Sequence, residues 1–294
     1  MTEPFRLIQH GDAVSGPMRH PRNLHQGAPN SIHNDAVASK LGMRGGTVAG
    51  NYHMDQFPPL LTTLYGRRWW QSGNLSLYFR YATTDNEGVR CFAERPADPT
   101  ASFARTRVWI DHENGERVAE GTAAVGAPDK DSALRQRIAA TPKPQDLRIL
   151  ANLGVGQKAK NAKPYRVERP RYETCLEILQ EPLPDYGPES SWGRPILPPS
   201  LMVDVMYSAQ FSLLERNPNY GVGLFGAIEL QSYDGPMFLE QDYDARIEVI
   251  AIGETPKTEY FWYESIASDP QTGREVAGML MMLRFMKASS PLWR

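Results

Sequence analysis

The sequence is poor in several features that would otherwise direct its function. Of its 294 residues only two are cysteines, Cys91 and Cys175, and they lie far apart. We therefore expect neither a disulfide framework nor a cysteine metal site. No apolar stretch reaches the roughly 20 residues of a membrane helix, and the opening MTEPFRLIQHGD lacks a signal-peptide core. We expect a cytoplasmic protein with no membrane segment.

The sequence also has no large excess of positive or negative charge. The 32 Lys and Arg residues and 34 Asp and Glu residues give a formal net charge of −2. Nucleic acid is therefore not an expected partner, although a local basic patch could still bind the phosphates of a small molecule. There is no dinucleotide-binding glycine motif and no spacing typical of metal ligands, so we expect no cofactor and no metal.

The most informative stretch present is 30–50, NSIHNDAVASKLGMRGGTVAG. His33 lies among turn residues, and Asp35 is expected to cap a short helix over 36–41 because its carboxylate can accept from free backbone amides. Glycines then allow a sharp turn into a second helix that begins at about 48–50. The free N–H groups at this helix start would face His33, which suits a carbonyl oxygen that gains negative charge.

The remainder of the first half has the pattern of a helix followed by strands. Apolar residues over 48–65 have helical spacing, and Pro58-Pro59 predicts a kink or restart. Alternation and turn residues predict strands over 74–82, 89–94, 102–111 and 117–125, with a first strand over 5–8. This order is typical of an α+β fold in which an antiparallel sheet wraps one central helix, the hot-dog arrangement.

The second half repeats this order. We predict a linker over 126–164, strands within 165–179, a loop over 181–199, a buried helix over 200–215, and strands over 223–231, 244–252, 258–268 and 275–286. Residues 46–51 align with 195–200, and Asp55 then falls on Asp204, which indicates duplication. The prediction is a double hot dog with an N-terminal domain over 1–140, a linker over 141–164 and a C-terminal domain over 165–294.

The stretch around His33 resembles the motif of the (R)-specific enoyl-CoA hydratases, the MaoC-like dehydratases of the hot-dog fold. That motif runs Gly-Asp-x-Asn-Pro-Ile/Leu-His-x-Asp, followed by Ala, a glycine-rich turn and a helix beginning at Gly. The matching residues here are Gly27, Ala28, Asn30, Ile32, His33, Asp35, Ala38, Gly42, Gly45 and Gly50. One departure affects the chemistry, because the catalytic aspartate of the family falls on Ala28.

The resemblance implies a substrate and roles for three residues. The substrate is an enoyl or β-hydroxyacyl thioester, with CoA as its carrier. His33 is the acid/base, Asn30 positions water or substrate, and the Gly50 amide polarises the thioester carbonyl.

Two open sheet edges in each chain favour a homodimer. All six histidines precede residue 113, so the first half is expected to supply the chemistry and the second half to help form the acyl pocket.

Ala28 cannot exchange a proton, which leaves three alternatives. In the first, another group replaces the carboxylate, and His25, His53 and Asp55 are the nearest in sequence. In the second, His33 alone suffices for an easier elimination. In the third, the site binds a ligand without catalysing a reaction. The last alternative is a non-catalytic acyl- or ligand-binding module. A further function is a hot-dog thioesterase in which Asp55 or Asp204 activates water, since a carboxylate in a buried helix is costly unless it is paired or functional.

Overall fold

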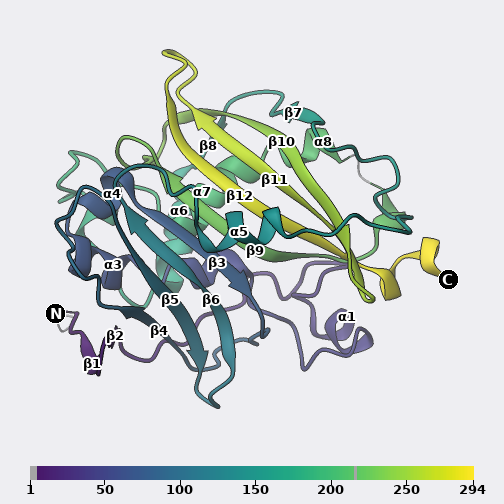
Figure 1. The fold of residues 1–294 in the computed structure, drawn as a ribbon, viewed down its shortest axis with the longest axis horizontal. Coiled ribbons are helices and arrows are strands. Elements are labelled where there is room, and N and C mark those ends of the chain that lie inside the picture. Colours follow the sequence, from purple (N-terminus) through teal and green to yellow (C-terminus); the bar gives the residue numbers. More distant parts are fainter. Residues whose placement is uncertain (1–4, 215–216) are drawn as a thin grey trace.

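The computed structural model describes residues 5–214 and 217–294, and its strands form one 12-stranded antiparallel sheet. Figure 1 shows the two halves side by side, each with its own set of long strands. The strands of the first half are β1 Ile8–His10, β2 Ala13–Ser15, β3 Asn74–Phe79, β4 Val89–Glu94, β5 Ala104–His112 and β6 Arg117–Val125. Those that follow are β7 Lys158–Lys160, β8 Tyr165–Arg166, β9 Gly223–Ser232, β10 Asp242–Glu254, β11 Thr258–Ser268 and β12 Glu275–Met286.

The helices are short, and most precede the long strands of their half. In the first half they are α1 Asp35–Lys40, α2 Gly50–Met54, α3 Pro58–Tyr65 and α4 Arg68–Ser72, and α5 Ala133–Ala139 follows the strands. In the second half they are α6 Arg169–Ile178, α7 Pro199–Tyr207 and α8 Gln210–Leu213. Short 3₁₀ turns complete the described chain at Pro184–Tyr186, Pro218–Tyr220, Lys287–Ser289 and Pro291–Trp293. No helix within the described ranges is long and apolar enough to cross a membrane.

The four long strands of each half follow the same order from the outside of the sheet to its centre. The sheet runs β1-β2-β4-β5-β6-β3-β9-β12-β11-β10-β7, so that β3 of one half pairs with β9 of the other at its centre, and β8 pairs with β10 outside this path. In this central ladder Asn74 lies opposite Gln231, and Tyr78 lies opposite Ala227. The first helical residues, Gly50 of α2 and Pro199 of α7, occupy the positions that the internal alignment equated. The predicted double hot dog is confirmed, whereas the exact domain boundaries stay a prediction.

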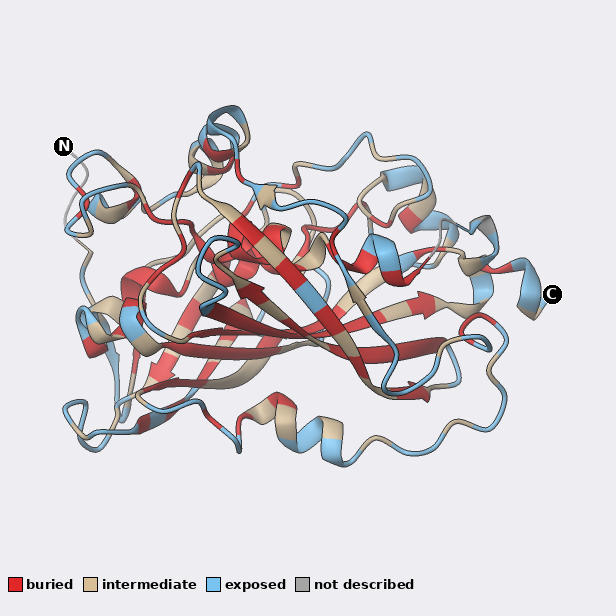
Figure 2. Ribbon diagram, turned by 90° about the horizontal axis from the view of Figure 1, so that it is seen from above, coloured by how far each residue is buried: buried red, intermediate tan, exposed pale blue. Residues whose placement is uncertain are grey.

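The sheet buries side chains on both faces. The inner face packs on α2, α3 and α7, whose side chains include the fully buried Leu60, Leu61 and Val205. The outer face is covered over the β3–β9 seam by α5, whose Leu134 packs in a cluster with Trp262. Figure 2 shows this burial along the strands, with exposed residues concentrated in the loops and outer turns.

The connection between the halves differs from its prediction as a linker. Residues 126–164 contain α5 and the edge strand β7, which pairs with β10. Helix α5 forms because Ser132 caps it, accepting from Arg135 N at 3.3 Å, and because Leu134 and Ile138 lie on one face. The leucine amide also donates to Ser76 Oγ of β3 at 3.1 Å. This segment therefore holds the seam between the halves.

Three further segments correct the sequence analysis. Strands were expected within 165–179, but only β8 is a strand there, and Arg169–Ile178 form helix α6, whose buried Tyr172 and Cys175 are three residues apart. The first strand begins at Ile8 instead of spanning 5–8. The helix predicted over 200–215 is divided into α7 and α8, and its predicted last residue, Glu215, lies outside the described residues. The predicted strands 89–94 and 117–125 match β4 and β6.

Candidate functional site

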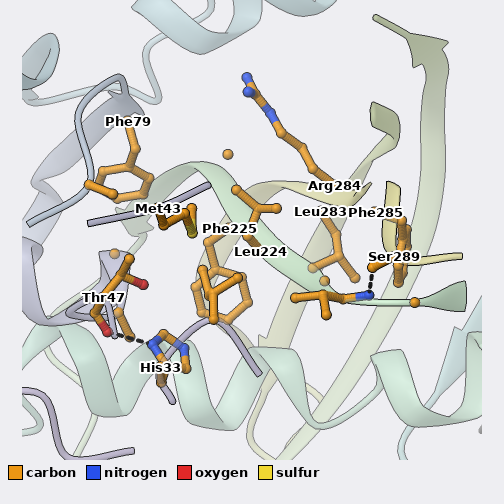
Figure 3. Close-up of a pocket in the computed structure, with 18 of the residues that line it drawn as sticks. His33, Met43, Thr47, Phe79, Leu224, Phe225, Leu283, Arg284, Phe285 and Ser289 are labelled. Carbon is orange, nitrogen blue, oxygen red and sulfur yellow. Dashed lines mark hydrogen bonds between the residues drawn. The ribbon is translucent and has the colours of Figure 1, made fainter. Parts of the chain in front are cut away.

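His33 is held by backbone contacts in the loop before α1. Its Nδ1 lies 2.7 Å from the Thr47 carbonyl oxygen, while Asn23 Nδ2 donates to the His33 carbonyl at 2.8 Å. A carbonyl can only accept, so Nδ1 carries a proton and Nε2 holds the lone pair of the neutral ring. Figure 3 shows the ring and its bond to Thr47 at the edge of a cavity. The loop therefore fixes both the orientation and the tautomer of His33.

The capping of α1 differs from its prediction. Asn34 is the N-cap, and its side-chain oxygen accepts from Ala36 N and Val37 N at 3.0 and 3.3 Å. Asp35 is the first helical residue, and its carboxylate instead accepts from Gly46 N at 2.7 Å. The reason is that the helix begins one residue earlier than expected. Asp35 therefore ties the glycine turn to the His33 loop.

Gly46 allows this loop to close. A Cβ at position 46 would lie 2.3 Å from the His33 carbonyl oxygen, which is backbone and cannot move aside alone. We expect Gly46→Ala to cost about 1–3 kcal/mol in stability, because the loop must shift. Thermal unfolding would measure this loss. Gly27→Ala is the matched control, since a Cβ there meets no atom of the described residues within 4 Å; equal stability of the two variants would contradict the prediction.

Both halves build the cavity beside His33, which has a volume of about 840 Å³. The predicted residues Asn30, His33 and Gly50 all line it. The second half contributes the end of α7, α8, and facing parts of β9 and β12. Sequence reasoning did not identify these lining residues, which include Tyr207, Phe211, Leu224, Phe225, Leu283, Arg284 and Phe285. The only sequence signal for them was the apolar character of the helix and strands around them.

Gly50 occupies the start of α2 at the cavity wall. The N-cap residue Ala49 provides no side-chain cap, so the first amides of α2 have no side-chain acceptor there. A Cβ at position 50 would lie 2.6 Å from the Phe79 ring. Glycine is thus required for the close approach of Phe79, and it leaves the helix start open to a small acceptor.

The two cavity histidines differ in their availability for proton transfer. Burial lowers the pKa of His33, although its bond to the Thr47 carbonyl partly offsets this effect. His33 is therefore a neutral base near pH 7. Burial lowers the pKa of His53 to about 4. Both ring nitrogens of His53 have partners, Thr83 Oγ1 at 2.9 Å and Gln56 Nε2 at 3.2 Å. His53 therefore has a structural role, because both of its ring nitrogens are engaged in hydrogen bonds.

His25 lies next to His33 and connects it to the second half. The two ring centroids are 5.4 Å apart, and His25 Nε2 lies 3.1 Å from the Tyr52 hydroxyl. That hydroxyl also accepts from Arg171 at 3.3 Å, and Arg171 pairs with Asp204 at 2.7 Å. Among the groups considered as substitutes for the missing aspartate, His25 is the one whose ring contacts the His33 ring.

Asp55, which was predicted as a candidate catalytic residue, is not among the residues that line the cavity. Its Oδ1 accepts from Ser200 N at 2.7 Å, in the first turn of α7, where Pro198 provides no side-chain cap. Its Oδ2 lies 4.0 Å from Cys175 Sγ. Asp55 therefore caps the helix of the opposite half. Asp204 is likewise absent from the cavity lining, and its carboxylate pairs with Arg171.

The buried position of Asp55 predicts a pH-dependent stability. Desolvation raises its pKa from 3.8 to about 7, so the folded protein binds a proton here that the unfolded chain releases. This contribution is complete below about pH 4 and is lost as the pH rises to about 7, with a maximum of roughly 4 kcal/mol. Asp55→Asn keeps an acceptor for Ser200 but does not titrate. Urea unfolding from pH 4 to 8 should show a smaller decrease in the variant; identical slopes would contradict the prediction.

The pseudo-symmetric counterpart of the cavity is closed. At the start of α7, which corresponds to the start of α2, the remaining hollow is about 20 Å³. Trp69 and Trp70 line it with Pro199, and Trp70 packs edge-on to Tyr186 at 6.0 Å between centroids. Aromatic side chains from the first half thus occupy the second position. Within the described ranges, no group of three or more His, Cys, Asp or Glu side chains could hold a metal ion.

Comparison with solved structures identifies the fold class. The chain aligns over 95% of its length with a Mycobacterium tuberculosis protein described as having a double hotdog fold, which it covers to 97% (14% identity, TM-score 0.63). A MaoC domain protein dehydratase from Chloroflexus aurantiacus, described as putative, aligns over 97% of this chain and 98% of its own (13% identity, TM-score 0.68). A MaoC-like dehydratase aligns over 94% and 98% (12% identity, TM-score 0.56). The chain is thus a double hot-dog protein, with MaoC-like dehydratases among its structural neighbours.

Sequence comparison provides no closer relationship. No protein-family model matches the chain, and no curated protein matches it.

Proposed function

We propose that the protein is a hydratase/dehydratase-type lyase that acts on an enoyl or β-hydroxyacyl thioester carried by CoA. The observation that carries this proposal is the neutral, oriented His33 at a cavity that Asn30 and Gly50 also line. Two structural neighbours are described as MaoC-type dehydratases, and the proposal extends that activity to this chain.

His33 performs both proton transfers in this mechanism. In elimination, Nε2 takes the α-proton, and the electron pair forms an enolate whose oxygen accepts from the Gly50 amide. The protonated ring then donates to the leaving β-hydroxyl, and water departs as the double bond forms. Hydration runs through the same steps in reverse. Asn30 positions the hydroxyl or the water. A single base that returns its proton does not require the carboxylate missing at Ala28.

A panel of thioesters tests the proposal. Enoyl-, 3-hydroxyacyl- and saturated acyl-CoAs of increasing length are incubated with the protein, and mass spectrometry follows each thioester. We expect gain or loss of one water and no free CoA. Asp55→Asn, whose side chain lies outside the cavity, is expected to behave as the wild type. Release of CoA from saturated substrates that disappears in Asp55→Asn or Asp204→Asn would establish a thioesterase, and binding without turnover of any substrate would establish a binding module.

The homodimer remains part of the proposal. In the described chain the edge strands β1 and β7 each have one neighbour within the sheet, so both ends of the sheet have open backbone groups. Sedimentation of the purified protein would determine its oligomeric state.

A further inference from the structure

A second hollow, of about 400 Å³, adjoins the cavity beyond Phe79. Its wall consists of Tyr78, Phe79, Arg80, Glu120, Arg137 and Arg284. Phe79, Arg80 and Arg284 also line the main cavity, so the two spaces share a boundary. Figure 3 shows Arg284 extending away from His33 on the far side of the cavity. We call Arg80, Arg137 and Arg284 the arginine cluster.

The arginine cluster has more positive than negative charge. Glu120 is the carboxylate of the hollow, and it accepts from Arg80 at 3.1 Å and from Arg137 at 3.3 Å. Arg284 has no carboxylate partner among the described residues; it donates to Tyr78 Oη at 2.6 Å and to Met282 Sδ at 3.0 Å. The residues that line the hollow therefore include three guanidinium groups and one carboxylate. The side chains of Arg80 and Arg137 are 53% and 43% exposed, so a solute can reach them.

Tyr78 and a glycine position two of these guanidinium groups, those of Arg137 and Arg284. Arg137 Cζ lies 3.9 Å from the centroid of the Tyr78 ring and Arg284 Cζ lies 5.2 Å from it, as cation–π contacts. A Cβ at Gly226 would lie 2.4 Å from Arg284 Nε, so glycine provides space for that side chain. The three arginines come from separate segments, after β3, on α5 and on β12. The fold therefore brings them together beside the cavity, with Arg137 and Arg284 over the Tyr78 ring.

We propose that the arginine cluster binds phosphate groups at the end of the pantetheine arm of the thioester carrier. Guanidinium groups pair with phosphate oxygens through two parallel hydrogen bonds, and a phosphate would balance the excess charge. The arm would then run from His33, past Phe79, to the cluster. This inference rests on the proposed function, and it assigns a role to α5, which belongs to the connection between the halves. The phosphate could belong to CoA or to a phosphopantetheine-bearing carrier protein.

Kinetics with carriers of different length test this proposal. The double variant Arg137→Gln/Arg284→Gln is compared with Arg246→Gln, a matched surface arginine 55% exposed that pairs with Glu275. For the CoA thioester, we expect KM to increase about 10- to 100-fold in the double variant, with kcat retained. For the same acyl group on N-acetylcysteamine, which has no phosphate, we expect no change. Arg246→Gln should match the wild type on both substrates.

Two results would overturn the proposal: an equal change on both substrates, or no change on either. If the double variant does not fold, Arg284→Lys keeps the charge without the two-pronged geometry, and a smaller increase in KM for the CoA thioester alone is expected. A 4′-phosphopantetheine thioester separates the sources. If the double variant also raises KM for this thioester, the cluster binds the phosphate that joins pantetheine to its carrier, which CoA and carrier proteins share. If KM increases only for the CoA thioester, the cluster binds the phosphates of the nucleotide part of CoA.

Calorimetry with free CoA separates this inference from the proposed function. Binding to the wild type that weakens in the double variant would support the cluster even if no thioester is turned over. Turnover of thioesters with no weakening of CoA binding in the double variant would reject the cluster and leave the lyase intact.

Discussion

Replacing His33 by alanine is expected to lower turnover by about 10²- to 10⁴-fold, the usual contribution of a positioned acid/base. The loss should be mainly in kcat, because the ring acts on the proton in the transition state while the cavity of about 840 Å³ still binds the acyl chain. Steady-state assays with the best substrate of the panel would measure it. His33→Gln should be equally inactive, since glutamine can still donate to the Thr47 carbonyl but cannot take a proton.

The pH profile separates catalysis from a structural role of His33. The pKa of His33 is below 6.5, and only the neutral ring accepts a proton. In the wild type, kcat/KM should therefore increase with pH through an inflection below pH 6.5 and become level at neutral pH. The acid limb should be absent from the residual activity of His33→Gln. His10→Gln, on the edge strand β1, is the control. Full activity in either His33 variant would reject the proposed mechanism.

Replacing Trp70 by alanine is expected to destabilise the protein by about 3–5 kcal/mol, as is typical of a buried large aromatic residue. Trp70 is 4% exposed, and it occupies the position that corresponds in the second half to the open cavity. Its removal leaves a void beside Tyr186 and the start of α7. Urea unfolding at fixed pH would measure the difference.

Trp192→Ala is the control for this prediction, because Trp192 is only half-buried. Its ring stacks on the Arg67 guanidinium, whose Cζ lies 3.6 Å from the ring centroid. We expect a markedly smaller loss there. The Trp70 variant should also keep kcat/KM when it is folded, since Trp70 does not line the first cavity. A loss no larger than that of Trp192→Ala would show that Trp70 does not fill the second position.

The fold was largely predictable because its information is local and repeated. Strands such as β4 alternate buried and half-buried residues strictly, and both central helices precede their strands in the same order. Among the errors were α5 and α6, where helical spacing was present in short, polar segments. Leu134 and Ile138 are four residues apart, and Tyr172 and Cys175 are three apart. Greater weight on these pairs and on the Ser132 cap would have identified both helices.

The site was only partly predictable. The stretch 30–50 is contiguous, so the sequence places Asn30, His33 and Gly50 near one another. The opposite wall comes from residues more than 150 positions later, such as Tyr207 and Phe285, and no local pattern links them to His33. For Asp55 the sequence suggested a role that its contacts do not show. It was a candidate for proton transfer or for activating water, and in the structure its carboxylate caps a helix of the second half.

The pairing of β3 with β9 inside a single chain has an evolutionary consequence. In an assembly of two identical hot dogs, each substitution occurs twice, so a tryptophan that fills one pocket must also fill the other. Covalent linkage removes this constraint. One copy can keep His33 and an open pocket while the other loses its histidines, fills its own pocket and provides the facing wall. Encoding the two copies as separate segments of one polypeptide therefore allows each to specialise.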